Sequence, residues 1–332
     1  MTSAQLHRAR RLLCALQDHL RGVLVAARKQ TPARLARVAA VTAADTIYRV
    51  DRIGEKAILF WFESHWPRAW PVELVMEGLE GEGPTVFPRG TPLARTAWKC
   101  ILDPIDGTRS LMYDKRSAWT LAALAPQRGP KTTLADIVVA AMTELPTSKQ
   151  CRADQLSAVR GGGIIAESVE AGSGRRKKIF PRPSGARNFR HGFASLVKFF
   201  PEGKSLLAAM EEELWRNVCD GARSGALVFD DQYLTTGGQI YELMAGHDRM
   251  IADLRPLALA KLNISSSLTC HPYDICTALL LTEAGGLVET PDGGPLRAPL
   301  DTTSSVAWIG YANATLARQV RPVLRRLMRK YF

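Results

Sequence analysis

The sequence has no uninterrupted apolar run that approaches the ~20 residues needed to cross a membrane. Residues 1–11 lack the apolar core and the small-residue cleavage site of a secretory signal peptide. The six cysteines include no CxxC pair and follow no regular framework, so we expect reduced thiols and not disulfides. Together these absences predict a cytoplasmic protein that does not associate with a membrane.

The sequence also lacks a nucleic-acid-binding motif, although its formal net charge is +12. Its basic residues are spread over the N-terminal third, the run 175–178 and the C-terminal tail, and the seven tryptophans are not interleaved with them. We interpret the charge as a solvated surface that attracts anionic substrates. The alternative, a nucleic-acid interface, predicts salt-sensitive retention of DNA or RNA.

Two other patterns are incomplete. Gly161–Gly163 lacks the Lys-Ser/Thr of a P-loop and the spacing of a dinucleotide fingerprint, so it predicts a hairpin turn. Residues 270–276 contain two cysteines, a histidine and an aspartate, but at no common structural zinc spacing. We expect neither a nucleotide loop nor a zinc site.

With 332 residues, of which 46% are hydrophobic and 23% charged, the chain is long enough for one large or two moderate globular domains. The stretch 171–183, rich in Gly, Arg, Lys and Pro, predicts a boundary between an N-terminal half, 1–180, and a C-terminal half, 181–332. We expect the two halves to form one compact unit.

Apolar residues at helical spacing over 4–29 predict an amphipathic helix, which we expect to pack on the domain and not to lie on a membrane. A second helix is predicted from Asp51, its expected N-cap, to His65, before Pro67. The remaining predicted helices are 205–217, 236–245, 274–284 and 314–330, and the predicted strands are 72–76, 93–102, 118–125 and 136–144.

The segment from Leu102 to Thr108 is the most informative feature, because it places two carboxylates three residues apart on a predicted turn. Asp103, Asp106 and the carbonyl of Ile105 offer three oxygens of the type that hard divalent cations bind. Pro104 stiffens the turn. The alternative is an ordinary Asp-rich turn.

A Gly-Thr pair follows these carboxylates. If a helix begins at Gly107, the amides of Gly107 and Thr108 face outward at the positive end of its dipole, which is a phosphate site. Metal ligands beside a phosphate site predict metal-assisted phosphoryl chemistry.

The 102–108 segment resembles a signature of the inositol monophosphatase-like superfamily of Mg²⁺-dependent, lithium-sensitive phosphatases, which includes fructose-1,6-bisphosphatases and 3'-phosphonucleotide phosphatases. Three other elements match the family pattern and occur in its order along the chain. Asp45 to Asp51 and Leu74 to Gly78 precede this segment, and His271 to Gly286 follows it. The resemblance covers about residues 40 to 310. It implies an α/β fold of the α+β type, a layered α-β-α-β-α sandwich.

The resemblance also implies a site. Its metal shell would hold two or three Mg²⁺ ions, with Mn²⁺ as a substitute, on Glu77, Asp103, the Ile105 carbonyl, Asp106 and Asp274. Glu77 and Thr108 would orient and deprotonate a water that attacks phosphorus in line, and Asp51 would hold the Thr108 hydroxyl. Gly107, Thr108 and Asp274 would contact the substrate.

Some of these assignments have competitors. Glu80 and Glu82 lie close to Glu77, and Gly78 stands where the family usually has a second Glu. The alternative for Asp51 is a helix N-cap alone, which its position would explain without catalysis.

Departures from the family pattern bear on the substrate. Arg109-Ser110-Leu111 replaces the usual Asn-Phe context, and Tyr273 replaces a Trp. In the family an acidic side chain from the segment before Asp274 contacts substrate hydroxyls, and Asp253 is a better candidate than Asp248, which begins a predicted strand. Arg255 is predicted either to bind a second anionic group or to form a surface salt bridge.

The resemblance therefore implies a metal-dependent phosphatase, a hydrolase of a small polyol or sugar phosphate, with lithium inhibition and a homodimer as family expectations. The alternatives are a 3'(2'),5'-bisphosphate nucleotidase, a fructose-1,6-bisphosphatase, or a metal-binding regulatory or scaffold protein of the same fold. The expected partner is a small phosphorylated metabolite.

Overall fold

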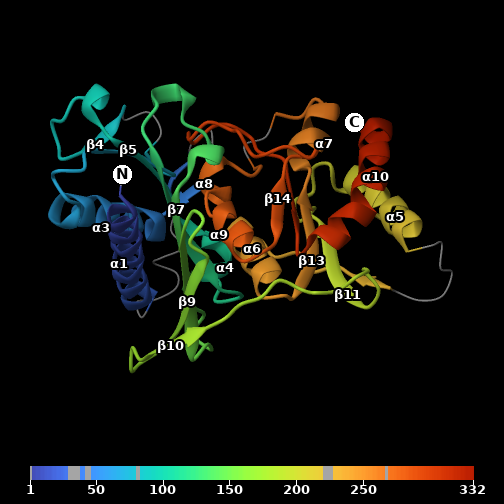
Figure 1. Ribbon diagram of the computed structural model, residues 1–332, viewed down its shortest axis with the longest axis horizontal. Coiled ribbons are helices and arrows are strands. Elements are labelled where there is room, and N and C mark those ends of the chain that lie inside the picture. Colours follow the sequence, from blue (N-terminus) through green and yellow to red (C-terminus); the bar gives the residue numbers. More distant parts are fainter. Residues whose placement is uncertain (1, 29–37, 42–45, 80–82, 220–226, 266–267) are drawn as a thin grey trace.

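The protein is built from five alternating layers of helix and sheet, α-β-α-β-α, which follow one another across the long axis in Figure 1. The computed structural model describes residues 2–28, 38–41, 46–79, 83–219, 227–265 and 268–332. The layered α/β fold expected from the sequence is confirmed.

The larger sheet has eight strands in the order β10-β9-β8-β7-β6-β5-β3-β4. Only β3 and β5 are parallel neighbours, and the other pairs are antiparallel. The strands are β3 (Val72–Met76), β4 (Thr85–Phe87), β5 (Trp98–Asp106), β6 (Ala118–Pro126), β7 (Val139–Leu145), β8 (Arg152–Val159), β9 (Ile164–Glu170) and β10 (Arg176–Ile179). Three 3₁₀ turns connect them: Leu93–Arg95, Gly129–Lys131 and Leu134–Asp136.

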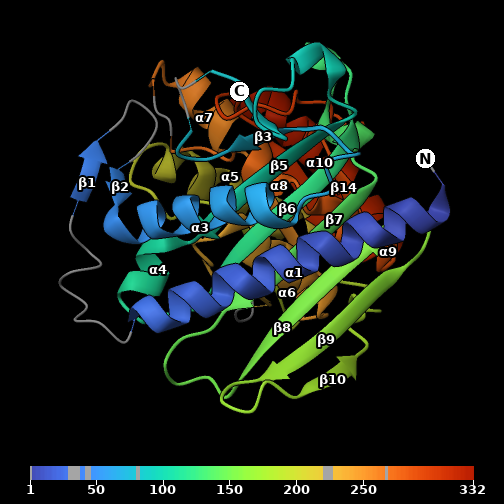
Figure 2. The same ribbon diagram turned by 90° about the vertical axis from the view of Figure 1, so that its left-hand side faces the viewer.

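Helices α1 (Ser3–Arg28) and α3 (Arg49–His65) cover the outer face of this sheet, as Figure 2 shows. The fully buried Gln17 of α1 donates hydrogen bonds to the carbonyls of Thr120 (3.1 Å) and Ala141 (2.8 Å) and accepts one from the Thr143 hydroxyl. These bonds satisfy a buried amide and fix the helix on the strands. The predicted packing of the first helix is confirmed. Among the described residues, no helix has the length and apolar content needed to cross a membrane.

The smaller sheet has five strands in the order β12-β11-β13-β15-β14. They are β11 (Gly192–Leu196), β12 (Val228–Phe229), β13 (Asp248–Asp253), β14 (Leu287–Glu289) and β15 (Trp308–Tyr311). A separate pair, β1 (Val38–Val41) and β2 (Thr46–Tyr48), precedes α3. The last strand of the larger sheet ends at Ile179, and the first strand of the smaller sheet begins at Gly192.

The remaining helices fill the middle and far layers. Helices α6 (Thr236–Met244), α8 (Pro272–Ile275) and α9 (Ala278–Glu283) lie between the two sheets, and α5 (Lys204–Val218), α7 (Arg255–Lys261) and α10 (Ala314–Tyr331) cover the smaller sheet (Figure 1). The short α4 (Thr108–Met112) follows β5 directly. Buried apolar side chains of the described residues form three clusters: one between α1, α3 and the larger sheet, one around the helices between the two sheets, and one between the smaller sheet and its outer helices.

The start of α3 differs from the prediction. The helix begins at Arg49, and its N-cap is Tyr48, not Asp51. Asp51 is the third helical residue, and its Oδ2 accepts the backbone N–H of Tyr48 at 2.7 Å. A carboxylate at this position satisfies a free N–H at the helix start as a capping residue would, which explains the misplaced cap.

The Asp-rich segment also differs, because it is not a turn. Strand β5 begins at Trp98 and continues through Asp106, and its pairing with β6 shifts register between Asp103 and Asp106. Pro104 lies inside this irregularity, where a residue without an N–H is tolerated in a strand. The predicted strand 136–144 begins at Val139.

The predicted helix 274–284 is broken into α8 and α9. Cys276 and Thr277 separate the two segments, and Thr277 lies at φ −90° and ψ 8°, in the bridge region. The other predicted helices and strands are present within a few residues, and Gly161–Gly163 forms the predicted hairpin between β8 and β9.

Candidate active site

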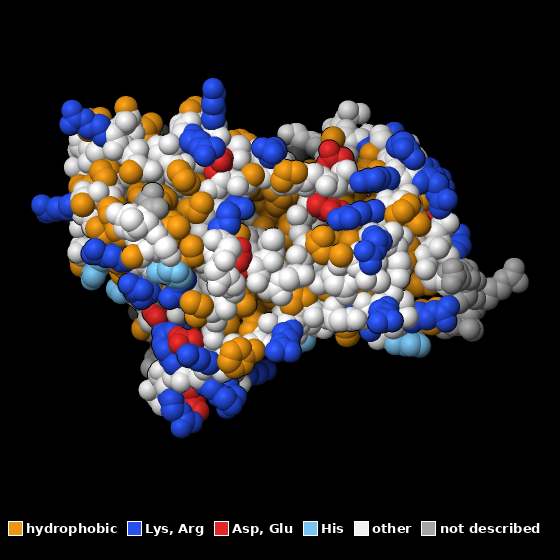
Figure 3. Space-filling model, viewed as in Figure 1, with side chains coloured by type: hydrophobic (Ala, Val, Ile, Leu, Met, Phe, Trp, Pro, Cys, Tyr) orange, Lys and Arg blue, Asp and Glu red, His pale blue; other side chains and the backbone are white. Residues whose placement is uncertain are grey.

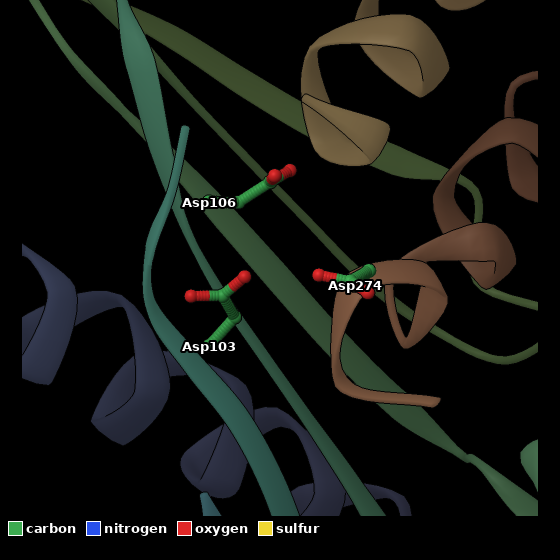
Figure 4. Close-up of side chains that lie close together, drawn as sticks. All are labelled: Asp103, Asp106 and Asp274. Atoms are coloured by element: carbon green, nitrogen blue, oxygen red, sulfur yellow. The ribbon is translucent and has the colours of Figure 1, made fainter. Parts of the chain in front are cut away.

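Three aspartates from two distant parts of the chain line one pocket. Asp103 and Asp106 come from the end of β5, and Asp274 comes from α8. Figure 4 shows the three side chains pointing into a common space. Each offers a carboxylate oxygen, and the three oxygens lie within 4.8 Å of one another. Such a set of hard oxygen donors suits Mg²⁺ or Mn²⁺.

Backbone amides orient all three carboxylates. Asp103 accepts the N–H of Ile105 at 2.9 Å, Asp106 that of Gly237 at 2.5 Å, and Asp274 that of His271 at 2.6 Å. Asp106 also accepts a backbone hydrogen bond from Thr236. Fixed ligands of this kind reduce the reorganisation needed when a cation binds.

The cluster is electrostatically unfavourable without a cation. Burial, together with the charges of Glu77 and Asp106, raises the pKa of Asp103 well above its usual range. Burial and the nearby Asp274 likewise raise the pKa of Asp106 well above its usual range. Burial raises the pKa of Asp274 to about 6. A divalent cation would remove this penalty, so the residues present fit a metal site.

In the metal-free protein we expect the free energy of unfolding to fall as the pH rises from about 5 to about 7. The pKa of Asp274 is about 6 in the folded protein and 3.8 in its unperturbed state, so the folded state binds more protons in this window. Stability gained from protonation is therefore lost as the pH rises. Thermal unfolding in chelator across this range measures the effect, which saturating Mg²⁺ should flatten and Asp274→Asn should reduce. A chelator-treated wild type that becomes more stable across the window would contradict the expectation.

Other residues assigned to the metal shell lie at the same pocket. Glu77 and Ile105 line it. Glu80 and Glu82, the competitors of Glu77, lie outside the described residues, as does Asp45 of the upstream motif. Gly78 adopts φ +89°, and a Cβ there would lie 2.4 Å from Oε1 of the buried Glu55. The close carboxylate of Glu55 accounts for the glycine at the position where the family pattern has a second Glu.

The Thr108 hydroxyl lies between two acceptors. It is 3.0 Å from Oδ1 of Asp51 and 3.0 Å from the carbonyl oxygen of Ile105. Asp51 therefore joins α3 to the pocket: one of its oxygens accepts the Tyr48 amide and the other accepts from Thr108. Its capping and site-supporting roles are compatible, because they use different oxygens.

The helix start expected at Gly107 differs from the prediction. Helix α4 begins at Thr108 and has five residues, so its dipole is small, and Gly107 precedes it at φ +100°. A Cβ on Gly107 would lie 2.3 Å from the Thr235 methyl group. Gly107 and Thr235 both line the pocket. A glycine at position 107 permits the left-handed backbone conformation and the close approach of Thr235 at the start of α6.

The structure corrects the role expected of Asp253. This side chain is fully buried and is not among the pocket-lining residues. Its carboxylate instead binds Arg255, which does line the pocket. Arg255 is itself buried, so the pair is not a surface salt bridge. Asp248, the competitor, begins β13 as predicted.

Several pocket residues were not predicted from the sequence. They are Arg109, Phe199, Phe200, Leu234, Thr235, Thr236, Leu268, Thr269, His271 and Tyr273. Gly237, which binds Asp106, was also missed. The only sequence signal for it is the run Thr235-Thr236-Gly237-Gly238 at a helix start, where Thr235 is the N-cap.

We expect Gly237→Ala to weaken metal binding roughly 10- to 100-fold, as is usual when a partner of a metal ligand is disturbed. A Cβ on Gly237 would lie 2.9 Å from Oδ2 of Asp106 and 2.6 Å from a methyl of Leu121, so Asp106 must move. Calorimetric titration with Mn²⁺ measures the change. Gly22→Ala, at a helical site with no atom within 4 Å of the new Cβ, is the matched control. Equal Mn²⁺ affinity in the two variants would contradict the role given to Gly237.

No protein-family model and no curated protein sequence matches the chain. Solved structures do. An extragenic suppressor protein, SuhB, from Bartonella henselae matches with a TM-score of 0.63 at 18% identity, over 98% of this chain and 100% of that one. Leishmania major fructose-1,6-bisphosphatase matches with a TM-score of 0.64 at 13% identity, over 95% and 93%.

A third structure, protein PH1897 from Pyrococcus horikoshii, is described as similar to inositol-1 monophosphatase. It matches with a TM-score of 0.60 at 14% identity, over 98% of both chains. The fold is that of the inositol monophosphatases and fructose-1,6-bisphosphatases. Since these matches span nearly the whole chain, the inositol monophosphatase fold includes both sheets and the helices between them.

Proposed function

We propose that this protein is a metal-dependent phosphatase that hydrolyses a small phosphomonoester. The observation that carries the proposal is the set of three pocket-lining aspartates, with oxygens within 4.8 Å of one another. The pocket encloses about 710 Å³ including its open mouth. The shared fold with a fructose-1,6-bisphosphatase supports the same reaction class.

In this proposal Asp103, Asp106 and Asp274, with Glu77 and the carbonyl of Ile105, hold Mg²⁺. A bound divalent cation would neutralise the carboxylates, polarise the phosphate and activate a water. The protein's own groups would do the rest by positioning, which dominates phosphoryl transfer.

Thr108 and Asp51 are the proposed positioning pair for the attacking water. The Thr108 hydroxyl can accept a hydrogen bond from water while it donates to Asp51, 3.0 Å away. Glu77, which lines the same pocket, is the proposed acceptor of the water's proton. The amides of Gly107 and Thr108 are the proposed donors to the phosphate oxygens.

The distribution of charge supports a small substrate. Lys and Arg side chains are scattered over the face seen in Figure 3 and do not form one continuous stripe. Such a surface attracts anions without tracking a nucleic-acid backbone.

The test is phosphate release from a panel of inositol, sugar and nucleotide phosphates, with Mg²⁺ and with chelator. We expect release from at least one class that needs the metal and is restored when Mg²⁺ is added back. Metal binding by the folded protein without release from any compound would overturn the enzyme proposal and favour a metal-binding scaffold. Preference for an adenosine bisphosphate would identify the nucleotidase alternative.

A further inference from the structure

Arg255 is held rigidly at the wall of the pocket that contains the three aspartates. Its Nε donates to Oδ1 of Asp253 at 2.9 Å and its Nη2 to Oδ2 at 2.5 Å, so the pair is bidentate. Its Nη1 donates to the carbonyl of Leu268 at 2.9 Å. The guanidinium carbon lies 4.5 Å from the ring centroid of Phe199 and 5.4 Å from that of Phe200.

This arrangement leaves donors available. A guanidinium carries five N–H groups, and the three bonds to Asp253 and Leu268 use three of them. The other two have no partner among the described residues. Arg255 is 6% exposed, so these donors are already largely removed from bulk water. Buried donors without partners are costly, and a ligand that accepts from them would recover that cost.

Of the ion pair formed by Arg255 and Asp253, only the cation lines the pocket. Asp253 is fully buried behind Arg255 and does not line the cavity. Arg255 lines the same pocket as Asp106 and Asp274, so its positive charge faces the aspartate cluster. Arg109 from α4 lines the same pocket and adds a second cationic side chain. The wall that faces the metal site is therefore suited to an anion, whereas sugar hydroxyls would be matched by an acidic or neutral side chain.

We propose that Arg255 binds a second anionic group of the substrate, so that the substrate is a small phosphomonoester with a further phosphate or carboxylate. Asp253 is a positioning residue that holds the guanidinium by its Nε and Nη2, and the aromatic pair Phe199 and Phe200 shields it. The inference rests on the proposed function and specifies its substrate class. A polyol monophosphate has no anionic group besides the phosphate at the metal site, so it would leave the free donors of Arg255 without a charged acceptor.

The experiment compares matched substrates that differ only by the second anion. Fructose 1,6-bisphosphate is paired with fructose 1-phosphate, adenosine 3',5'-bisphosphate with adenosine 3'-phosphate, and 3-phosphoglycerate with glycerol 3-phosphate. The first two pairs test a phosphate and the third a carboxylate. The measured quantity is the ratio of kcat/KM within each pair, with Mg²⁺.

The test variant is Arg255→Lys, which keeps a cation beside Asp253 and so protects folding, but loses the planar fork. The matched control is Arg321→Lys. Arg321 on α10 makes the same bidentate contact, to Glu289, and lies 5.8 Å from the Tyr311 ring, but it does not line the pocket. Both variants therefore alter an aromatic-backed arginine–carboxylate pair.

We expect the wild type to prefer the substrate with two anionic groups in at least one pair. Arg255→Lys should reduce that preference roughly 10- to 100-fold, as for loss of charged hydrogen bonds. Arg321→Lys should keep the wild-type ratio. Equal kcat/KM within every wild-type pair, or an equal loss for both members in Arg255→Lys, would overturn the inference while the phosphatase proposal stands.

If no compound is hydrolysed, the phosphatase proposal fails. Calorimetric titration with the same pairs then decides, since equal affinities within every pair overturn the role of Arg255.

Discussion

Asp106→Asn should lower metal-dependent kcat/KM by at least about 10³-fold, because a catalytic cation supplies several kcal/mol of charge stabilisation in the transition state. Asparagine has nearly the same shape, and its amide oxygen can still accept the Gly237 N–H that Asp106 accepts at 2.5 Å. The variant therefore removes a charged ligand with little change in packing. Phosphate release at saturating Mg²⁺ measures the effect.

The same substitution should stabilise the metal-free protein at neutral pH. Burial and Asp274 raise the pKa of Asp106, so its ionised form costs free energy in the folded state, and asparagine removes that cost. Thermal unfolding in chelator should show a higher Tm than wild type, with a smaller increase on adding Mg²⁺. Asp231→Asn, at an exposed ion pair with Arg116, is the matched control. Full activity in Asp106→Asn would refute the proposed metal site.

Thr108→Val should lower kcat by about 10²- to 10⁴-fold, the usual range for groups that orient or move a proton in catalysis. Valine keeps the branched shape but removes the hydroxyl that lies 3.0 Å from both Asp51 and the Ile105 carbonyl. KM should change much less, because the pocket wall is retained. Steady-state kinetics with the preferred compound separates the two parameters.

Thr108→Ser is the control, since it keeps the hydroxyl and should retain most of the activity. Asp51→Asn should also be impaired, and in the Thr108→Val background it should add little, because the two residues act through one hydrogen bond. Independent, multiplicative losses would show that Asp51 acts elsewhere, through its bond to the Tyr48 amide. An unchanged kcat in Thr108→Val would remove Thr108 from the proposed chemistry.

The parts of the site that sequence predicts well are local. Asp103, Ile105 and Asp106 lie within four residues, so one short segment carries their relative placement. Asp274 was identified by resemblance, and the structure brings it to the same pocket. Helices and strands with a clear apolar period were also predictable, because burial on one face dictates that period.

The parts that sequence does not predict depend on tertiary contacts. Gly237 and Asp106 are 131 residues apart, and their hydrogen bond exists only because α6 packs across β6. Asp253 and Arg255 were both assigned to the substrate site, but only Arg255 lines the pocket. Which of the two side chains does so depends on where β13 ends and α7 begins, and local pattern does not determine that point to within two residues.

Errors at element ends have similar causes. Asp51 satisfied a helix-start amide from the third position and so resembled an N-cap. Pro104 predicted a turn, but a register shift lets β5 continue through it to Asp106. In both cases the sequence identified the right residues, while the backbone path was set by neighbouring strands and helices.

The central claim is that Asp103, Asp106 and Asp274 together hold a divalent cation. The most direct measurement is an anomalous difference map at the manganese edge from crystals grown with MnCl₂. The account predicts a peak that contacts carboxylate oxygens of all three aspartates and is lost in Asp106→Asn crystals. A map in which manganese binds elsewhere, or leaves these three side chains without a peak, would contradict the account.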